Sequence, residues 1–338
     1  MPQQAFNMEE NMSIKSKILS KLEDQDDYIS GEEIAVQLGV SRAAVWKAVR
    51  SLKDEGFEIS SIRNRGYRLI AAADALSCDQ IKTHMNTAAS KLDLIVLESV
   101  DSTNNEAKRM LANGYEGRCL IVANEQTGGR GRLGRTFYSP KNTGIYMSFL
   151  FKTDLKLSDA VTVTTAASVA VVEAIESVTG IVPEIKWVND VYVGEKKVCG
   201  ILTEAVSDFE TATARNVIIG IGINITTSDF PEELRVSASS LGVHTPVRNE
   251  LIAATANKLV LFAKNLCDHS LFIESYRRHS LVVGREIDFY INGNKNTGTA
   301  ESIDENGGLV VRLENGDMTT LSSGEVTVRL KGAAFGSK

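Results

Sequence analysis

Arginine and glycine are interleaved in one short stretch, "EQTGGRGRLGRTF" at residues 125–137. Guanidinium groups among flexible glycines can grip nucleic acid, cradle the phosphates of a nucleotide, or belong to a linker. A Rossmann fingerprint needs a helix directly after its glycines, whereas "RTFYSPKNTG" follows here, and Pro140, Asn142 and Gly144 indicate a turn. A P-loop needs a closing Gly-Lys-Ser/Thr, which this stretch lacks. Neither of these two nucleotide-binding motifs fits.

Two apolar runs, "CLIVANE" and "IYMSFLF", flank the stretch and are typical of strands. This position argues against a disordered Arg-Gly segment that binds RNA. We therefore predict a loop between two strands of a central domain, ordered when it holds a ligand. Its cations suit a polyanion such as a triphosphate.

Lysines in a second stretch, "EIKWVNDVYVGEKKVCGILTE", could serve the same purpose. Lys186 ends one predicted strand, Asn189 and Asp190 form a turn, and Lys197 begins an apolar strand that reaches Gly200. Taken singly, the two lysines are read as solvated surface residues. Together with the arginine loop, they favour an anionic substrate.

A third stretch, "NVIIGIGINIT", predicts a buried strand with Gly220 and Gly222 on one side and Asn224 at its end. Glycine inside a strand usually marks a close approach by another backbone or by a ligand. The strand is thus a candidate wall of the same site.

A helix-turn-helix is predicted near the N-terminus. Ser30 and Glu33 fit a capping box that begins a short helix ending at Leu38. Gly39 supplies a turn, and Ser41 can cap a second helix. In that second helix, apolar residues recur at the i, i+4, i+7 spacing of one buried face; they are Val45, Val49 and Leu52.

Positive charge gathers on this N-terminal segment. Residues 41–70 hold seven basic residues against three acidic ones, in a chain whose net charge is −6. We predict a winged helix that binds DNA through its second helix and a hairpin tip. The residues expected to face DNA are Ser41, Arg42, Lys47, Arg50, Lys53, Arg63, Arg65 and Arg68. The alternative is a small helical module that binds another protein.

Bulk composition indicates an ordinary globular protein. The 338 residues are 43% hydrophobic and 24% charged, enough for two or three domains. The four cysteines are too far apart for metal pairs or a redox motif, which favours reduced thiols. The most apolar run is interrupted by Thr and Glu, so we expect no membrane span and a cytoplasmic protein. Near the C-terminus, short alternating runs between Asn-Gly turns predict a barrel of about five strands.

The order of these motifs resembles the family of bifunctional biotin-protein ligases and biotin-operon repressors. The resemblance runs from about residue 12 to 330 and includes "DSTNNEA", "EQTGGRGRLGR", "KWVND", "KVCGILTE", "GIGINI" and "SGEVTVR". One departure is Val188, where the family commonly has proline; valine keeps the backbone N–H and frees φ, so we expect a less rigid turn.

This resemblance implies an α+β protein of three domains. They are a winged helix-turn-helix at 12–72, a mixed α/β ligase domain with a class II synthetase-like sheet at 75–283, and an SH3-like barrel at 284–332. The implied reaction joins biotin and ATP, with Mg²⁺, into biotinyl-5′-AMP and then transfers biotin to a lysine of a biotin carboxyl-carrier domain. Such chemistry needs alignment and cations but no enzyme nucleophile.

Site residues follow from the same resemblance. The implied catalytic set is Lys197, Arg132, Arg135, Lys186 and Asp190. Biotin would contact Ser102, Thr103, Asn104, Gln126, Gly129, Arg130, Gly131, Arg132, Lys197, Gly200 and Gly220. Of these, Gly200 and Gly220 would leave room for its bicyclic ring. The nucleotide would contact Arg132, Arg135, Lys186, Asn189 and Asn224, with Asn224 near Mg²⁺ bound through the phosphates.

Partners are also implied by the resemblance: the carrier domain, and operator DNA of biotin genes bound by a homodimer that forms when the adenylate is present. Such coupling requires only that the ligand bind better to the dimer-competent state. Three alternatives stay open. The chain could be an effector-sensing transcription factor without ligase activity, a lipoate-type ligase, or a ligase whose basic head binds a protein.

Overall fold

The computed structural model describes residues 13–23, 25, 27–54, 57–62, 65–71, 74–154, 160–208, 213–291, 294–322 and 329–330. The chain divides into two compact units. Residues 1–84 and 245–249 make the first unit, and residues 85–244 and 250–338 make the second. All four cysteines lie in the described part of the chain, and none of them is in a disulfide.

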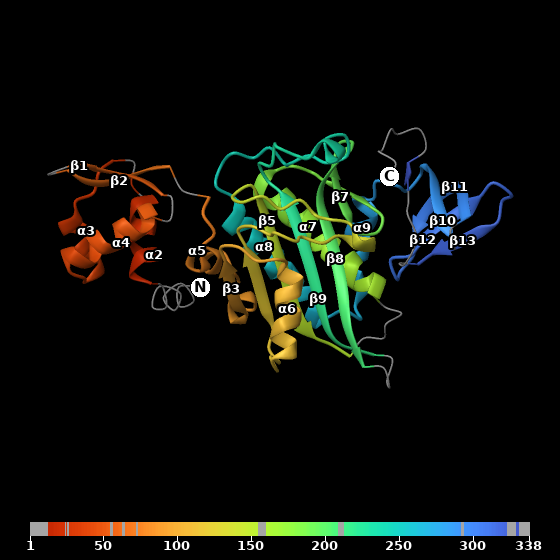
Figure 1. Cartoon of the computed structure of the whole chain (residues 1–338), viewed down its shortest axis with the longest axis horizontal. Helices are drawn as coiled ribbons and strands as arrows, with labels where there is room; N and C mark the ends of the chain where they lie inside the picture. The colour runs from red at the N-terminus through yellow and green to blue at the C-terminus, as the bar shows by residue number, and fades with distance from the viewer. Residues whose placement is uncertain are drawn as a thin grey trace. The chain divides into compact units, whose positions relative to one another are not determined.

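The first unit has the predicted winged-helix elements (Figure 1). Ser30 Oγ accepts a hydrogen bond from Glu33 N at 3.0 Å, and Gly39 takes the left-handed conformation with φ of 66°. Both ends of the first motif helix are therefore where the capping signals place them. The predicted helices are α3 (Gly31–Leu38) and α4 (Arg42–Asp54), and the predicted hairpin is β1 (Glu58–Ile62) and β2 (Gly66–Ala71); α2 (Ile14–Glu23) and α5 (Cys78–Thr83) were not predicted.

Helix α4 is held by its apolar face. Val45, Val49 and Leu52 are buried among residues of α2, α3 and β1. Ser41 Oγ accepts from Ala44 N at 3.2 Å and caps the helix. Strands β1 and β2 pair antiparallel as the predicted hairpin. The polar face of α4 is thus turned to solvent.

The second unit is built on a seven-stranded sheet with the order β3-β4-β5-β9-β8-β7-β6. Only β3 and β4 are parallel; the other described neighbours pair antiparallel. The strands are β3 (Asp93–Leu97), β4 (Cys119–Ala123), β5 (Gly144–Lys152), β6 (Glu184–Lys186), β7 (Asp190–Val193), β8 (Lys196–Asp208) and β9 (Thr213–Asn224). The helices are α6 (Thr103–Ala112), α7 (Ala160–Thr179), α8 (Arg248–Lys264) and α9 (Ile273–Arg278).

Helices α6 and α7 cover opposite faces of this sheet. Successive side chains of a strand point to opposite faces, so the contacts of two neighbouring residues show which helix lies on which face. On β8, Glu204 bonds to Asn104 of α6, whereas its neighbour Thr203 bonds to Thr164 of α7. By length and composition, Val161–Thr179 could cross a membrane, but 78% of its most apolar window is buried inside the protein. Helix α7 is therefore a core helix of this unit.

Five antiparallel strands follow the seven-stranded sheet, the number predicted. Trp187 Nε1 donates to Gly307 O at 2.9 Å, so the strand-rich segment is bonded to the loop between β6 and β7. The predicted turn at Asn292-Gly293 lies outside the described residues. The strands are β10 (Glu286–Ile291), β11 (Asn294–Ile303), β12 (Leu309–Leu313), β13 (Met318–Leu321) and β14 (Arg329–Leu330).

Candidate active site

The beginning of α6 forms one wall of the candidate site. Thr103 N and Thr103 Oγ1 both donate to Gln126 Oε1, at 2.9 and 3.2 Å. Gln126 Nε2 in turn donates to Ser139 Oγ at 3.0 Å. Ser102 occupies the N-cap position, but its side chain makes no capping hydrogen bond. These bonds tie the helix start to the segments on both sides of the glycine-arginine loop.

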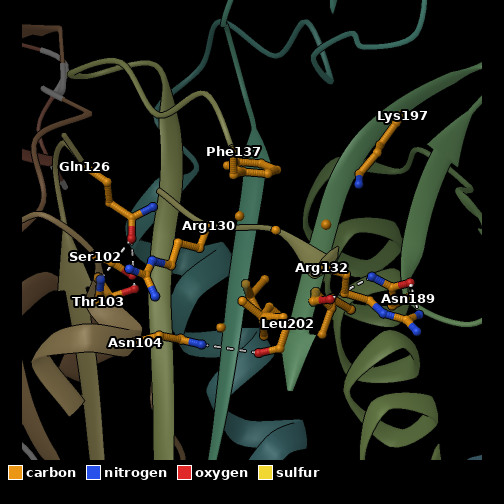
Figure 2. A pocket seen from close by; sticks show the side chains of 16 residues that line it. Ser102, Thr103, Asn104, Gln126, Arg130, Arg132, Phe137, Asn189, Lys197 and Leu202 are labelled. Atoms are coloured by element: carbon orange, nitrogen blue, oxygen red, sulfur yellow. Dashed lines mark hydrogen bonds between the residues drawn. The ribbon is translucent and has the colours of Figure 1, made fainter. Parts of the chain in front are cut away.

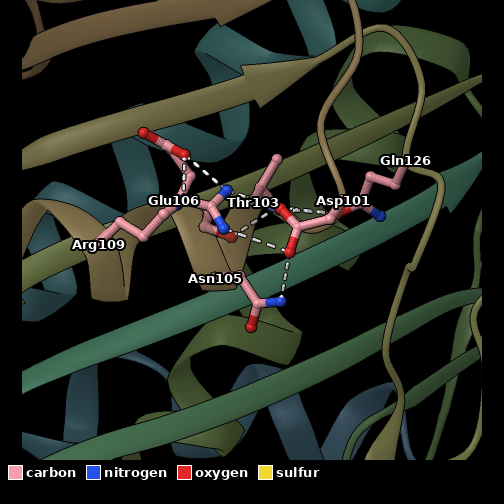
Figure 3. Close-up of polar contacts among 7 residues, drawn as sticks. Asp101, Thr103, Asn105, Glu106, Arg109 and Gln126 are labelled. Carbon is pink, nitrogen blue, oxygen red and sulfur yellow. Dashed lines mark hydrogen bonds and ion pairs between the residues drawn. The ribbon is translucent and has the colours of Figure 1, made fainter.

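A charged cluster around Asp101 holds the beginning of α6 in place (Figure 3). Asp101 accepts from Arg109 Nη2 at 2.6 Å and from Asn105 Nδ2 at 2.7 Å. Its backbone oxygen also accepts from Gly128 N at 2.7 Å. The hydrogen bond from Arg109, followed by that from Asn105, holds the pKa of Asp101 well below its usual range. The cluster positions the turn that leads into α6.

The glycine-arginine loop joins β4 to β5, as predicted, and has internal hydrogen bonds. Gly131 N donates to Arg135 O at 2.7 Å, and Phe137 N donates to Gly129 O at 2.9 Å. A Cβ on Gly129 would collide with the carbonyl of Phe137. Glycine at position 129 therefore permits the loop to fold on itself.

Cationic groups form the opposite wall. Arg132 Nη1 donates to Asn189 Oδ1 at 3.0 Å, and burial lowers the pKa of this guanidinium. Lys197 Nζ lies 2.6 Å from Asp190 Oδ1. Asp190 also favours the charged form of Arg132, although less strongly than burial opposes it. Two cations from distant segments are thus held near one carboxylate.

Glycines in the central strands make room for neighbouring side chains. A Cβ on Gly222 would collide with the ring of Phe137, and one on Gly220 would collide with the carboxamide of Asn104. At Gly200, a Cβ would lie 3.1 Å from Lys197 Nζ and 3.3 Å from Phe137 Cε2. At Gly220, the space expected for a ligand ring is therefore filled by the side chain of Asn104.

These walls border an open pocket whose empty space, counted together with the solvent at its mouth, is about 460 Å³ (Figure 2). Eleven of the residues expected to contact biotin or nucleotide line it: Ser102, Thr103, Asn104, Gln126, Arg130, Gly131, Arg132, Asn189, Lys197, Gly200 and Gly220. Five other expected residues are not in its lining: Gly129, Arg135, Lys186, Asp190 and Asn224. The carboxylate of Asp190 is nevertheless next to the site, because it pairs with Lys197, which lines the pocket.

Some lining residues were not expected from the sequence. Phe137, Ile201, Leu202 and Ile221 also border the pocket, whereas Gly222, which borders it too, lies on the strand predicted as a wall. Phe137 has no polar group to suggest chemistry, but it lies opposite the glycines of β8 and β9 that give its ring space. Paired glycines facing one aromatic residue were the signal that could have revealed it.

Metal-binding capacity is limited in the described part of the chain, where no cluster of three His, Cys, Asp or Glu side chains could hold an ion. Asn224 Oδ1 is buried and has no hydrogen-bond partner among the described residues. Oxygen ligands suit Mg²⁺, which commonly binds through substrate phosphates and few protein groups. The residues present therefore fit a magnesium ion carried mainly by a nucleotide.

The winged-helix unit presents a separate polar face. Ser41, Arg42, Lys47, Arg50 and Lys53 are exposed on or next to α4. Two further features of this face were not predicted. Trp46 is 56% exposed, with Arg50 Cζ 5.5 Å from its ring centre, and Tyr28 lies beneath both hairpin arginines, Arg65 and Arg68. Arg63 lies outside the described residues.

Family models match three segments of the chain. They are an HTH domain at residues 15–68, the biotin/lipoate A/B protein ligase family at 96–224, and the biotin protein ligase C-terminal domain at 282–329. A solved biotin protein ligase from Aquifex aeolicus, in complex with biotin and ATP, is 32% identical with a TM-score of 0.59. The match covers 71% of this chain and 99% of that one. Fold and site thus define a protein ligase with an HTH head.

The curated relatives match this chain over both its HTH segment and its ligase segment. The bifunctional ligase/repressor BirA of Bacillus spizizenii is 35% identical over 300 residues, covering 86% of this chain and 91% of that protein. BirA of Escherichia coli is 25% identical and covers 90% of this chain. The chain belongs to the family of bifunctional biotin ligase/repressors.

Proposed function

We propose that this protein activates biotin with ATP to form biotinyl-5′-AMP, transfers biotin to a lysine of a biotin carboxyl-carrier domain, and represses biotin genes. One observation carries the ligase half. A single pocket has hydrogen-bonding groups of α6 on one wall and Arg132 and Lys197 on the other. This arrangement suits a molecule with a polar ring at one end and an anionic reacting group at the other.

In the first step, an oxygen of the biotin carboxylate attacks the α-phosphorus of ATP, and the bond to pyrophosphate breaks. Both reactants are anionic, so their approach is opposed by charge. Arg132 and Lys197 lower this barrier by neutralising the carboxylate and the developing phosphate charge. In the second step, the neutral amine of the carrier lysine attacks the acyl carbon, AMP leaves, and the amine loses a proton.

Several finer assignments belong to the same proposal. The glycine-arginine loop covers the adenylate, and Arg135 and Lys186 approach the nucleotide phosphates when it is bound. Mg²⁺ would accompany ATP and neutralise phosphate charge, and Asn224 Oδ1 would be available to hold it. Asp190 orients the incoming lysine.

The repressor half rests on the exposed basic face of α4. The adenylate-bound protein forms a homodimer, and two heads double the phosphate contacts that one head makes. Unmodified carrier domain competes for the adenylate and relieves repression. The protein acts in the cytoplasm, where carboxylases, ATP and DNA are together.

Mass spectrometry of a carrier domain incubated with the protein, biotin and Mg-ATP tests the ligase. The expected product has one biotinyl group on one lysine. Preferred transfer of lipoate would instead establish a lipoate ligase, and no biotin-dependent exchange of pyrophosphate into ATP would leave only a sensor. A mobility shift of biotin-gene operator DNA that requires biotin and ATP tests the repressor.

A further inference from the structure

On the side of β8, the carboxamide of Asn104 has partners that allow only one orientation of the group. Its Nδ2 donates to Glu204 Oε2 at 2.8 Å and to Leu202 O at 3.4 Å (Figure 2 shows the latter). Its Oδ1 accepts from Ser148 Oγ at 2.5 Å. Carboxylate and carbonyl oxygens are acceptors only, so the amide nitrogen must face β8.

The bonding capacity that remains to Asn104 is small. Both protons of Nδ2 are used, whereas Oδ1 has two lone pairs and Ser148 uses one of them. Asn104 is 3% exposed, lines the pocket, and has its oxygen above Gly220, another lining residue. Towards the pocket, Asn104 therefore offers one hydrogen-bond acceptor.

Gln126 retains the complementary capacity. Its Oε1 accepts two bonds from Thr103, and its Nε2 gives one of two protons to Ser139. Among the bonds of the described residues, one N–H of Gln126 is left. One acceptor from Asn104 and one donor from Gln126 match the adjacent N–H and C=O groups of a cyclic urea.

Glu204 is itself held in place. Lys108 Nζ, one turn along α6 from Asn104, lies 2.6 Å from Glu204 Oε1. Each carboxylate oxygen thus has its own donor. A neutral amide at position 204 would have one oxygen for two donors, and the ammonium of Lys108 would compete for it.

We propose that Glu204 and Ser148 are positioning residues that hold the amide oxygen of Asn104 towards the pocket and thereby select ligands with a ring N–H. The inference rests on the proposed biotin site but concerns residues that do not line the pocket. The orientation of the Asn104 amide therefore decides which ligands the site accepts. If the amide were reversed, its N–H would face the N–H of the ligand.

Glu204→Gln is the main test. Lys108 would draw the oxygen of the new amide, leave its NH₂ facing Asn104, and so reverse the Asn104 amide. We expect KM to rise about tenfold or more for biotin and for desthiobiotin, which both have ring N–H groups. For an analogue with a cyclic carbonate in place of the urea, binding should change less than about twofold. The KM for ATP should stay constant.

Two further variants separate positioning from folding. Lys108→Met combined with Glu204→Gln frees the amide oxygen for Asn104, so most of the lost biotin affinity should return. Glu173→Gln is the matched control, because Glu173 also bonds a lysine and another side chain, with 23% of its side chain exposed against 27% for Glu204. It should alter neither KM nor ligand preference.

Calorimetry with the three ligands, together with exchange kinetics, distinguishes the outcomes. Equal loss of biotin and the carbonate analogue in Glu204→Gln, or absence of rescue by Lys108→Met, would overturn the proposal. Ser148→Ala provides a second test if Glu204→Gln does not fold; because Ser148 Oγ also lies 2.7 Å from Thr103 Oγ1, we expect a smaller loss that is greater for the N–H ligands than for the carbonate analogue. Failure of the unaltered protein to form an adenylate would refute the proposed function instead.

Discussion

Lys197 Nζ lies 2.6 Å from Asp190 Oδ1, and this ion pair joins neighbouring strands β7 and β8 beside the pocket. We expect Lys197→Met to lower kcat/KM for adenylate formation by about 10²–10³-fold, because a positioned cation is lost from a partly buried site. Pyrophosphate exchange measures this step. Activity within threefold of the unaltered protein would show that Lys197 only balances Asp190.

The partner residue should affect a different step. We expect Asp190→Asn to slow transfer to the carrier lysine by about tenfold more than it slows adenylate formation, since Asp190 is assigned to the incoming amine. Single-turnover transfer from preformed biotinyl-5′-AMP measures the second step alone. Equal slowing of both steps would instead mean that Asp190 acts only through Lys197.

Arg132, in the glycine-arginine loop, donates a hydrogen bond to Asn189, which lies 57 positions further along the sequence. We expect Arg132→Gly to increase the release of biotinyl-5′-AMP by at least about tenfold, because the charge-assisted hydrogen bond that holds the loop to Asn189 is lost. Formation of the adenylate should fall less. Chromatography of free biotinyl-5′-AMP after rapid filtration gives the release rate, and an unchanged rate would contradict the role of the loop as a cover.

The ring of Phe137 occupies the space that a side chain at position 222 would need. We expect Gly222→Ala to push the ring aside and to weaken biotin binding by about tenfold or more, since the close contact cannot be relieved without moving Phe137. Phe137→Ala alone should also weaken binding, by removing an apolar wall. In the double variant, the combined loss should be smaller than the sum of the two single losses. Additive losses in calorimetry would show that the residues act separately.

The Asp101–Arg109 pair gives a pH dependence of known sign. A carboxyl group whose folded pKa is depressed stabilises the protein above its unfolded pKa of about 3.9, and this contribution disappears as pH falls through the folded pKa. The difference in Tm between the protein and Arg109→Gln should be constant from about pH 8 to 5 and shrink below about pH 4. A difference that grows on acidification would refute this assignment.

Arg50 tests the DNA interface. If it neutralises one phosphate in each head of the homodimer, Arg50→Gln should reduce the slope of log affinity against log salt by about two. Arg118, exposed in the ligase unit, offers a matched control whose Arg118→Gln variant should keep the slope. Ligation should be unaffected in both variants. An unchanged slope in Arg50→Gln would remove this residue from the interface.

Local signals predicted the secondary structure of the head well. Ser30, Gly39 and Ser41 delimit the helices because capping depends on nearby backbone groups. The same holds for the strands on either side of the glycine-arginine loop. By contrast, the Asn104–Glu204 and Arg132–Asn189 contacts join residues 100 and 57 positions apart. The spacing of apolar residues along the sequence carries no information about contacts between residues so far apart in the chain.

Residue types by themselves therefore determined the kinds of chemistry that the chain can perform: cations among glycines, a polar helix start, and a basic recognition helix. Only the tertiary structure decided which groups still have bonding capacity. Gly220 was expected to leave room for a ligand ring, yet its space holds the carboxamide of Asn104. The reason is physical: a hydrogen bond or a close contact depends on position to within a fraction of an ångström, which sheet pairing and helix packing set together.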